Sequence, residues 1–105
     1  MKIQINTDGN ISQSDIQTAE IEATIRSVLK RFSGQLTRVE VHLSDENSSK
    51  KFGLTDMRCL LEARPEGLDP VAVTEEAESV ERSVDGAARK MRRALDSLLA
   101  RRQAH

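Results

Sequence analysis

Apolar and polar residues alternate in four stretches of the chain, which is the pattern of β-strands with one buried face. The stretches are residues 2–6, 38–43, 57–64 and 71–74, and the last can extend to Ala77. Successive side chains of a strand point to opposite sides of its sheet. The alternation therefore predicts four half-buried strands, with core-facing side chains that include Val39, Val41, Leu43, Met57, Cys59, Leu61 and Ala63.

Residues 16–32 change to the period of an amphipathic helix. Their apolar side chains fall within about 100° on a helical wheel, at Ile21, Ile25, Val28, Leu29 and Phe32. Ser12 and Ser14 are rival N-caps, and Gly34 is expected to end the helix in the left-handed conformation. A second helix is expected from Ser79 or Ser83 to about Ala100, with an apolar stripe of Val84, Ala87, Ala88, Met91, Leu95 and Leu98.

The predicted elements follow one another in the order β-α-β-β-β-α. A strand–helix–strand crossover makes the first two strands parallel, and hairpins join the others. Both helices then cover one face of a four-stranded sheet, which is an α+β fold. With 105 residues the chain is expected to form a single domain, residues 1–105. Within it, residues 46–55 are predicted to be a flexible loop and residues 101–105 a frayed tail.

The compartment follows from residues that the chain lacks. Cys59 is the only cysteine, so no intrachain disulfide can form and a reducing compartment is expected. No apolar run approaches 18 residues, and residues 1–8 do not resemble a signal peptide. The sequence therefore predicts a cytoplasmic protein with no membrane partner.

Charge is segregated along the chain, although its formal net value is only −1. Acidic residues gather at Glu75, Glu76, Glu78 and Glu81, before and at the start of the second helix. The same helix is basic further on, because residues 82–105 hold seven Lys or Arg and two Asp. The position of charges matters more than their sum for binding a polyanion, so a nucleic-acid partner is not excluded.

The basic residues of the second helix allow two interpretations. Arg82, Arg89 and Arg93 share the side opposite the apolar stripe, and Lys90, Arg101 and Arg92 flank them. Such a ridge could follow a phosphate backbone and release its counterions. It could equally be a solvated face whose cations the helix macrodipole favours near the C-terminus. The charge pattern alone does not choose between them.

Other cations carry the same two interpretations. Arg26 and Lys30 share one side of the first helix, and they would extend the ridge if the two helices pack side by side. Arg31 points elsewhere. Lys50 and Lys51 lie in the predicted loop, where they would either contact RNA or keep the loop soluble.

Catalytic chemistry finds little support in the sequence. Cys59 and His42 could supply a nucleophile and a base, but they are predicted to point to opposite faces of the sheet. No CxxC or HExxH spacing marks a metal site, and the glycines are isolated. The acidic cluster is better explained as a solvated edge than as a cation site. We therefore expect no enzyme activity, no metal, no cofactor and no small-molecule substrate.

Three stretches resemble the ribosome hibernation-promoting factor family, which includes ribosome-associated inhibitor A and was once labelled sigma-54 modulation protein. They are residues 1–6 (MKIQIN), 36–44 (LTRVEVHLS) and 71–78 (VAVTEEAE), the last leading into 84–91 (VDGAARKM). This passage is similar to the family's transition from the fourth strand into its second helix. The resemblance extends over nearly the whole chain.

The resemblance implies a non-enzymatic translation inhibitor that binds RNA of the small ribosomal subunit through basic residues of both helices. Matched by position, and with Arg82 added from the ridge, these residues would be Arg26, Lys30, Arg31, Arg82, Arg89, Lys90, Arg93 and Arg101. The alternative is a protein–protein interaction module, or a weak homodimer, of the same fold that no longer binds ribosomes. Leu60 on the otherwise polar sheet face favours this alternative.

Overall fold

The computed structural model describes residues 1–8, 18–45 and 57–103. Its elements are β1 (Lys2–Thr7), α1 (Thr18–Val28), the short 3₁₀ helix η2 (Lys30–Phe32), β2 (Leu36–Asp45), β3 (Met57–Pro65), β4 (Val71–Ala77) and α2 (Val80–Gln103). This order confirms the predicted α+β fold. The strands match the four alternating stretches, with β2 two residues longer at each end.

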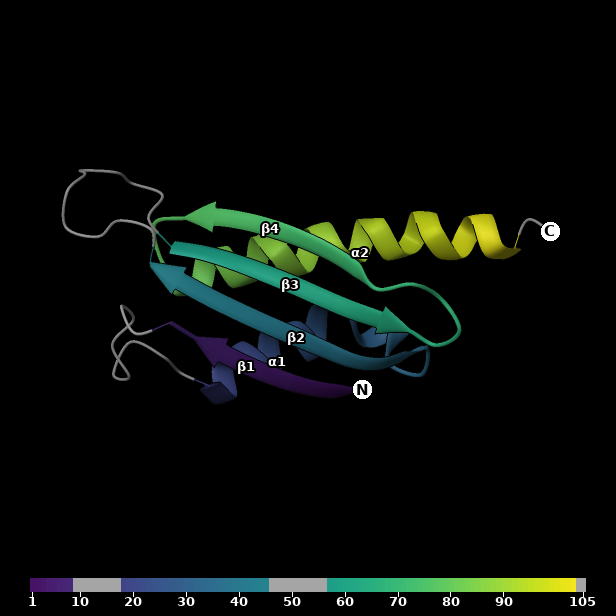
Figure 1. The fold of residues 1–105 in the computed structure, drawn as a ribbon, viewed down its shortest axis with the longest axis horizontal. Helices are drawn as coiled ribbons and strands as arrows, with labels where there is room; N and C mark the ends of the chain where they lie inside the picture. The colour runs from purple at the N-terminus through teal and green to yellow at the C-terminus, as the bar shows by residue number, and fades with distance from the viewer. Residues whose placement is uncertain (9–17, 46–56, 104–105) are drawn as a thin grey trace.

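The sheet has the strand order β1-β2-β3-β4. β1 pairs with β2 in parallel, with Ile3 opposite Val39. The other two pairs are antiparallel, with Val41 opposite Leu61 and Leu61 opposite Val73. Both helices lie on one side of this sheet (Figure 1). The predicted parallel pair, the two antiparallel pairs and the one-sided helix layer are therefore all present.

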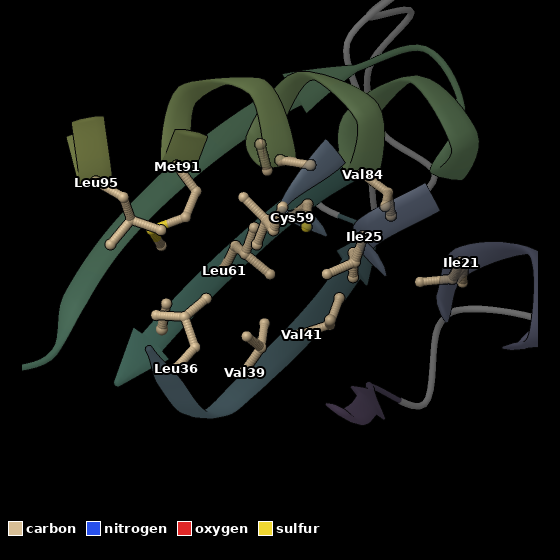
Figure 2. Packing of buried hydrophobic residues seen from close by; sticks show 14 of the residues in the cluster. Ile21, Ile25, Leu36, Val39, Val41, Cys59, Leu61, Val84, Met91 and Leu95 are labelled. Atoms are coloured by element: carbon tan, nitrogen blue, oxygen red, sulfur yellow. The ribbon is translucent and has the colours of Figure 1, made fainter. Parts of the chain in front are cut away.

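The hydrophobic core fills the space between the sheet and the helices (Figure 2). Ile25 of α1, Val41 of β2, Leu61 of β3 and Met91 of α2 have no exposed surface. Burying a side chain of this size stabilises a fold by about 1.5–3 kcal/mol. The aliphatic residues of the edge strands, such as Ile3, are only partly buried. The core is therefore densest under the two central strands.

The first helix ends differently from the prediction. α1 stops at Val28 and passes into η2, in which Phe32 N–H donates to Leu29 O at 2.9 Å. Ser33 at the end of this turn keeps right-handed helical angles, with φ −58° and ψ −32°. The last carbonyls of a helix need N–H donors from outside its regular hydrogen bonds. Here the i to i+3 bonds of the 3₁₀ turn supply donors that a left-handed residue would otherwise provide. The expectation of a left-handed Gly34 is wrong, since among the described glycines Gly67 alone has a positive φ.

The second helix begins at Val80 and is capped by Ser79, whose hydroxyl oxygen accepts a hydrogen bond from Arg82 N–H at 3.2 Å. Ser83, the rival cap, is buried inside the helix and donates to Val80 O. With 24 residues α2 is about 36 Å long, and it continues three residues beyond its predicted end.

The predicted apolar stripe of α2 is buried from Val84 to Leu95, Val80 of the first turn joins it, and its end differs. Leu99 packs against the core where Leu98 was expected. Leu99 and Ala100 line a small cavity together with Phe32 of η2, so the last turns of α2 lie beside η2.

Some predictions lie outside the described residues. These are the flexible loop at 46–55, the two candidate caps Ser12 and Ser14, and the last two residues of the chain. No helix in the described ranges is both long and apolar enough to cross a membrane.

Candidate nucleic-acid interface

The two helices run side by side in the same direction (Figure 1). Near their N-termini, Glu20 and Thr24 of α1 line one cavity together with residues of the first two turns of α2, among them Val80 and Gly86. Near their C-termini, η2 and residues 96–100 of α2 line a second, smaller cavity. The helix layer therefore has one end with two helix N-termini and one end with two helix C-termini.

The N-terminal end of this layer is acidic. Its cavity, of about 860 Å³, is bordered by four carboxylates, those of Glu20, Glu75, Glu81 and Asp85. Arg82 is the one cation among the described lining residues. Carboxylates are favoured here because the macrodipoles of both helices place partial positive charge at this end. Among the described residues, no group of three or more His, Cys, Asp or Glu side chains could hold a metal ion.

The C-terminal end of the layer is basic. Lys30 and Arg31 lie in η2, and Arg92, Arg93 and Arg101 lie in the second half of α2. Asp96 is the acidic residue among them. The helix macrodipoles favour cations at this end for the same reason that they favour carboxylates at the other. The molecule thus presents an acidic and a basic end along one helix layer.

Half of the cations of the predicted ridge on α2 are already paired with a carboxylate. On α2, Arg82 lies 2.7 Å from Glu78, and Arg89 lies 3.0 Å from Asp85. Lys90 reaches across to β4, where its Nζ atom lies 2.7 Å from Oε1 of Glu75. Each pair offsets one positive charge in the first half of the helix, so this half is less basic than the sequence indicated.

On the first helix the structure separates the predicted residues. Arg26 pairs with Glu22 and donates to Met1 O at 3.3 Å, which places it beside β1 and away from α2. It does not join the ridge. Arg31 lies over the ring of Phe32, 4.9 Å from its centroid, and forms an ion pair with Asp96 of α2. Arg31 therefore joins η2 to α2.

Four cations of the helix layer form no ion pair with any described residue, and we call them the unpaired cations. They are Lys30, Arg92, Arg93 and Arg101. Lys30, Arg93 and Arg101 are exposed and were predicted as RNA contacts, whereas Arg92 was left out of that set and is partly buried. Asp96, four residues beyond Arg92, pairs with Arg31 of η2, so helical spacing places Arg92 on the side of α2 that faces η2. All four lie toward the basic end.

Glu75 is the residue whose position the sequence interpretation missed. It was grouped with the solvated acidic edge, but it points to the helix side of the sheet, opposite Cys59 in the register. The signal was present, because Glu75 continues the alternation of Val71 and Val73. Its contacts with α2 follow from this orientation.

The sheet face opposite the helices is polar, as predicted. Glu40, 17% exposed, lies 3.2 Å from Arg38 and 3.9 Å from Arg64, and His42 Nε2 is 3.4 Å from it. Leu60 is partly buried between its register partners on β2 and β4. The homodimer suggested by Leu60 stays a prediction.

The buried thiol is separated from the histidine, as predicted. Cys59 lies in the core, whereas His42 lies on the opposite face beside Glu40. Burial raises the pKa of the Cys59 thiol to about 12, and the nearby Glu75 carboxylate adds to the rise. A thiol with this pKa is not ionised at neutral pH and is a poor nucleophile. Lys50 and Lys51, the predicted loop contacts, lie outside the described residues.

Comparison with solved structures shows the same fold in two proteins. The N-terminal domain of Thermus thermophilus Protein Y superposes with a TM-score of 0.70 at 20% identity, covering 93% of this chain and 99% of that one. A ribosomal subunit interface protein from Coxiella burnetii gives a TM-score of 0.66 at 15% identity, covering 95% and 99%. Likeness at this identity establishes the fold and not the function.

Sequence comparison identifies the family. A search of curated proteins gives no match. The profile of the family described as "Sigma 54 modulation protein / S30EA ribosomal protein" matches residues 3–103, nearly the full length of the chain. The chain belongs to the sigma-54 modulation protein / S30EA ribosomal protein family.

Proposed function

We propose that this protein is a ribosome-associated translation inhibitor of the hibernation type, which binds small-subunit ribosomal RNA through the unpaired cations. Membership in the S30EA ribosomal protein family supports the ribosome as partner. The descriptions of the two structural neighbours, a Protein Y domain and a ribosomal subunit interface protein, support the same partner. No cofactor or substrate enters this proposal.

The distribution of ion pairs is the observation that carries the RNA-binding surface. A paired arginine lies beside a carboxylate that repels an incoming phosphate and must also give up its ion pair, so the new contact returns less free energy. An unpaired cation needs no such exchange, and each phosphate that it neutralises releases counterions into solution. Lys30, Arg92, Arg93 and Arg101 are therefore proposed to contact the RNA. Arg82 and Arg89, at the acidic half of α2, are proposed to contribute less.

Sedimentation with purified small ribosomal subunits across a salt series tests the proposal. The slope of log K against log salt should be steep for the wild type. Replacing Arg93 and Arg101 with glutamine should reduce its magnitude by about 1.4–1.8, since each lost phosphate contact removes about 0.7–0.9. The same double variant should inhibit translation in a purified system less than the wild type does.

The variant with Arg82→Gln and Arg89→Gln is the matched control, because it removes the same charge from the same helix. Its affinity should fall, but its salt slope should stay close to that of the wild type. Wild-type protein that stays in the supernatant at the lowest salt concentration would refute ribosome binding. An equal loss of slope in both double variants would refute the role given to ion pairing.

A further inference from the structure

Glu75 of β4 lies directly under α2. Its side chain is 29% exposed and faces Gly86. A Cβ atom at position 86 would lie 2.6 Å from both Cγ and Oε2 of Glu75, closer than real carbon contacts allow. The absence of a side chain at Gly86 therefore provides the space in which the carboxylate lies.

Lys90, one helical turn beyond Gly86, is held at the same place. Its Nζ atom lies 2.7 Å from Glu75 Oε1 and donates a hydrogen bond to Thr74 O, also at 2.7 Å. The ammonium thus contacts one side-chain oxygen and one main-chain oxygen of β4. These contacts also occupy a carbonyl of an edge strand, a position at which lysine discourages pairing with another chain.

This pair differs from the other ion pairs of α2. Arg82 and Arg89 each pair with a residue four positions earlier in the sequence, and both arginine side chains are more than half exposed. Such pairs on a helix surface exchange easily with solvent and are worth about 0.3–0.5 kcal/mol. Lys90 instead joins a helix to a strand, with two oxygen partners on that strand. It is the most restrained cation of the predicted ridge.

We propose that Glu75 is a specificity-determining residue of the RNA-binding surface, because it withholds Lys90 from phosphate and marks where the surface ends. This inference rests on the proposed function. The Lys90 ammonium has three donors, and two of them are held by oxygens of β4, so it could contact a phosphate only through the third donor or by leaving those oxygens. In either case the phosphate would lie beside the Glu75 carboxylate, which repels it. Lys90, although basic and on the ridge, is therefore not a phosphate contact in the wild-type protein.

The salt series with small subunits tests the role of Glu75 through Glu75→Gln. Freeing Lys90 should add one phosphate contact, and the slope should steepen by about 0.7–0.9. The loss of affinity between 50 and 200 mM salt should then be about three times larger than that of the wild type. Glu81→Gln is the matched control: it removes the same charge at the same end, from a side chain with no ion pair to a described residue. Its slope should not change, and equal slopes in Glu75→Gln and the wild type would overturn the inference.

Chemical labelling tests the restraint on Lys90 without any RNA. Acetic anhydride acylates a free amine, so Lys90 must leave its two oxygens before it reacts. In the free wild-type protein, Lys90 should react several-fold more slowly than Lys30, and Glu75→Gln should remove this difference. Gly86→Ala gives a second route, because it displaces the carboxylate without removing its charge, and it should also accelerate acylation.

The two experiments separate the possible failures. If the wild type does not sediment with small subunits, the proposed function is wrong, and labelling alone decides whether Glu75 restrains Lys90. If Lys90 reacts as fast as Lys30 in the wild type, the restraint is absent and the inference is wrong, whatever the ribosome experiment shows.

Discussion

Replacing Gly86 with alanine places a methyl group where the Glu75 side chain lies. The obstacle is the end of a flexible side chain and not the backbone, so the fold should survive the substitution. Glu75 would have to turn away, and its 2.7 Å ion pair with Lys90 would be lost. The substitution therefore sets the helix preference of alanine against a specific contact between α2 and β4.

The two effects have similar magnitudes. Alanine in a helix interior is favoured over glycine by about 0.5–1 kcal/mol. Loss of a partly exposed ion pair costs about 0.2–1 kcal/mol, and a strained rotamer costs about 0.5–1.5 kcal/mol. In the wild-type background, Gly86→Ala should therefore change the free energy of unfolding by between a gain of about 0.3 kcal/mol and a loss of about 2 kcal/mol. In a Glu75→Ala background the obstacle is gone, and Gly86→Ala should stabilise the protein by about 0.5–1 kcal/mol.

A double-mutant cycle over positions 75 and 86 measures the difference directly. Because the chain has no Trp or Tyr, urea unfolding is best followed by far-UV circular dichroism. The midpoints should shift at constant m value, and the coupling free energy should be about 0.7–2.5 kcal/mol. If Gly86→Ala changes stability equally in both backgrounds, the close approach of Glu75 to Gly86 does not exist in solution.

Two further predictions concern the core. Leu61→Ala should lower the free energy of unfolding by about 2–5 kcal/mol, because Leu61 is fully buried on a central strand. A urea titration that shows a loss below about 1 kcal/mol would contradict that packing. Since burial raises the pKa of the Cys59 thiol from 9.0 to about 12, the unfolded chain loses this proton at lower pH than the folded one. This contribution to stability is complete below pH 9 and falls from there to pH 12, by about 1.4 kcal/mol per pH unit. Urea midpoints measured across this range should decline less steeply for Cys59→Ala, and parallel declines would show that the thiol is not shielded.

The fold was predictable because periodicity reports which side of an element is buried. Alternation placed Val41 and Leu61 in the core, and the helical period did the same for Ile25 and Met91. The errors lie where a neighbouring element intervenes. The 3₁₀ turn at Lys30–Phe32 replaced the expected glycine termination, and Leu99, which lies near Phe32, packs against the core in place of Leu98. The end of α1 and the packing of Leu99 both depend on contacts with another part of the chain, which hydrophobic periodicity does not report.

The candidate site was predictable only in outline. A helical wheel gives the side of the helix on which a cation lies, and it placed Arg93 and Arg101 on exposed positions correctly. It contains no information on partners from other elements. The pairing of Lys90 with β4 and of Arg31 with Asp96 depends on how α2 lies against its neighbours. Charge segregation was visible in the sequence, but the division into paired and unpaired cations required the three-dimensional arrangement.

The parallel pairing of β1 with β2 also imposes an order on folding. Lys2 lies opposite Arg38, 36 positions later in the chain, whereas β2, β3 and β4 are joined as successive antiparallel neighbours. Closing a longer loop costs more chain entropy before any contact forms, so we expect the three later strands to assemble with α2 before β1 docks. Contacts made last affect the rate of unfolding more than the rate of folding. In stopped-flow experiments Ile5→Ala should therefore speed unfolding and leave refolding nearly unchanged, which makes the N-terminal strand the part of the molecule that governs its kinetic lifetime.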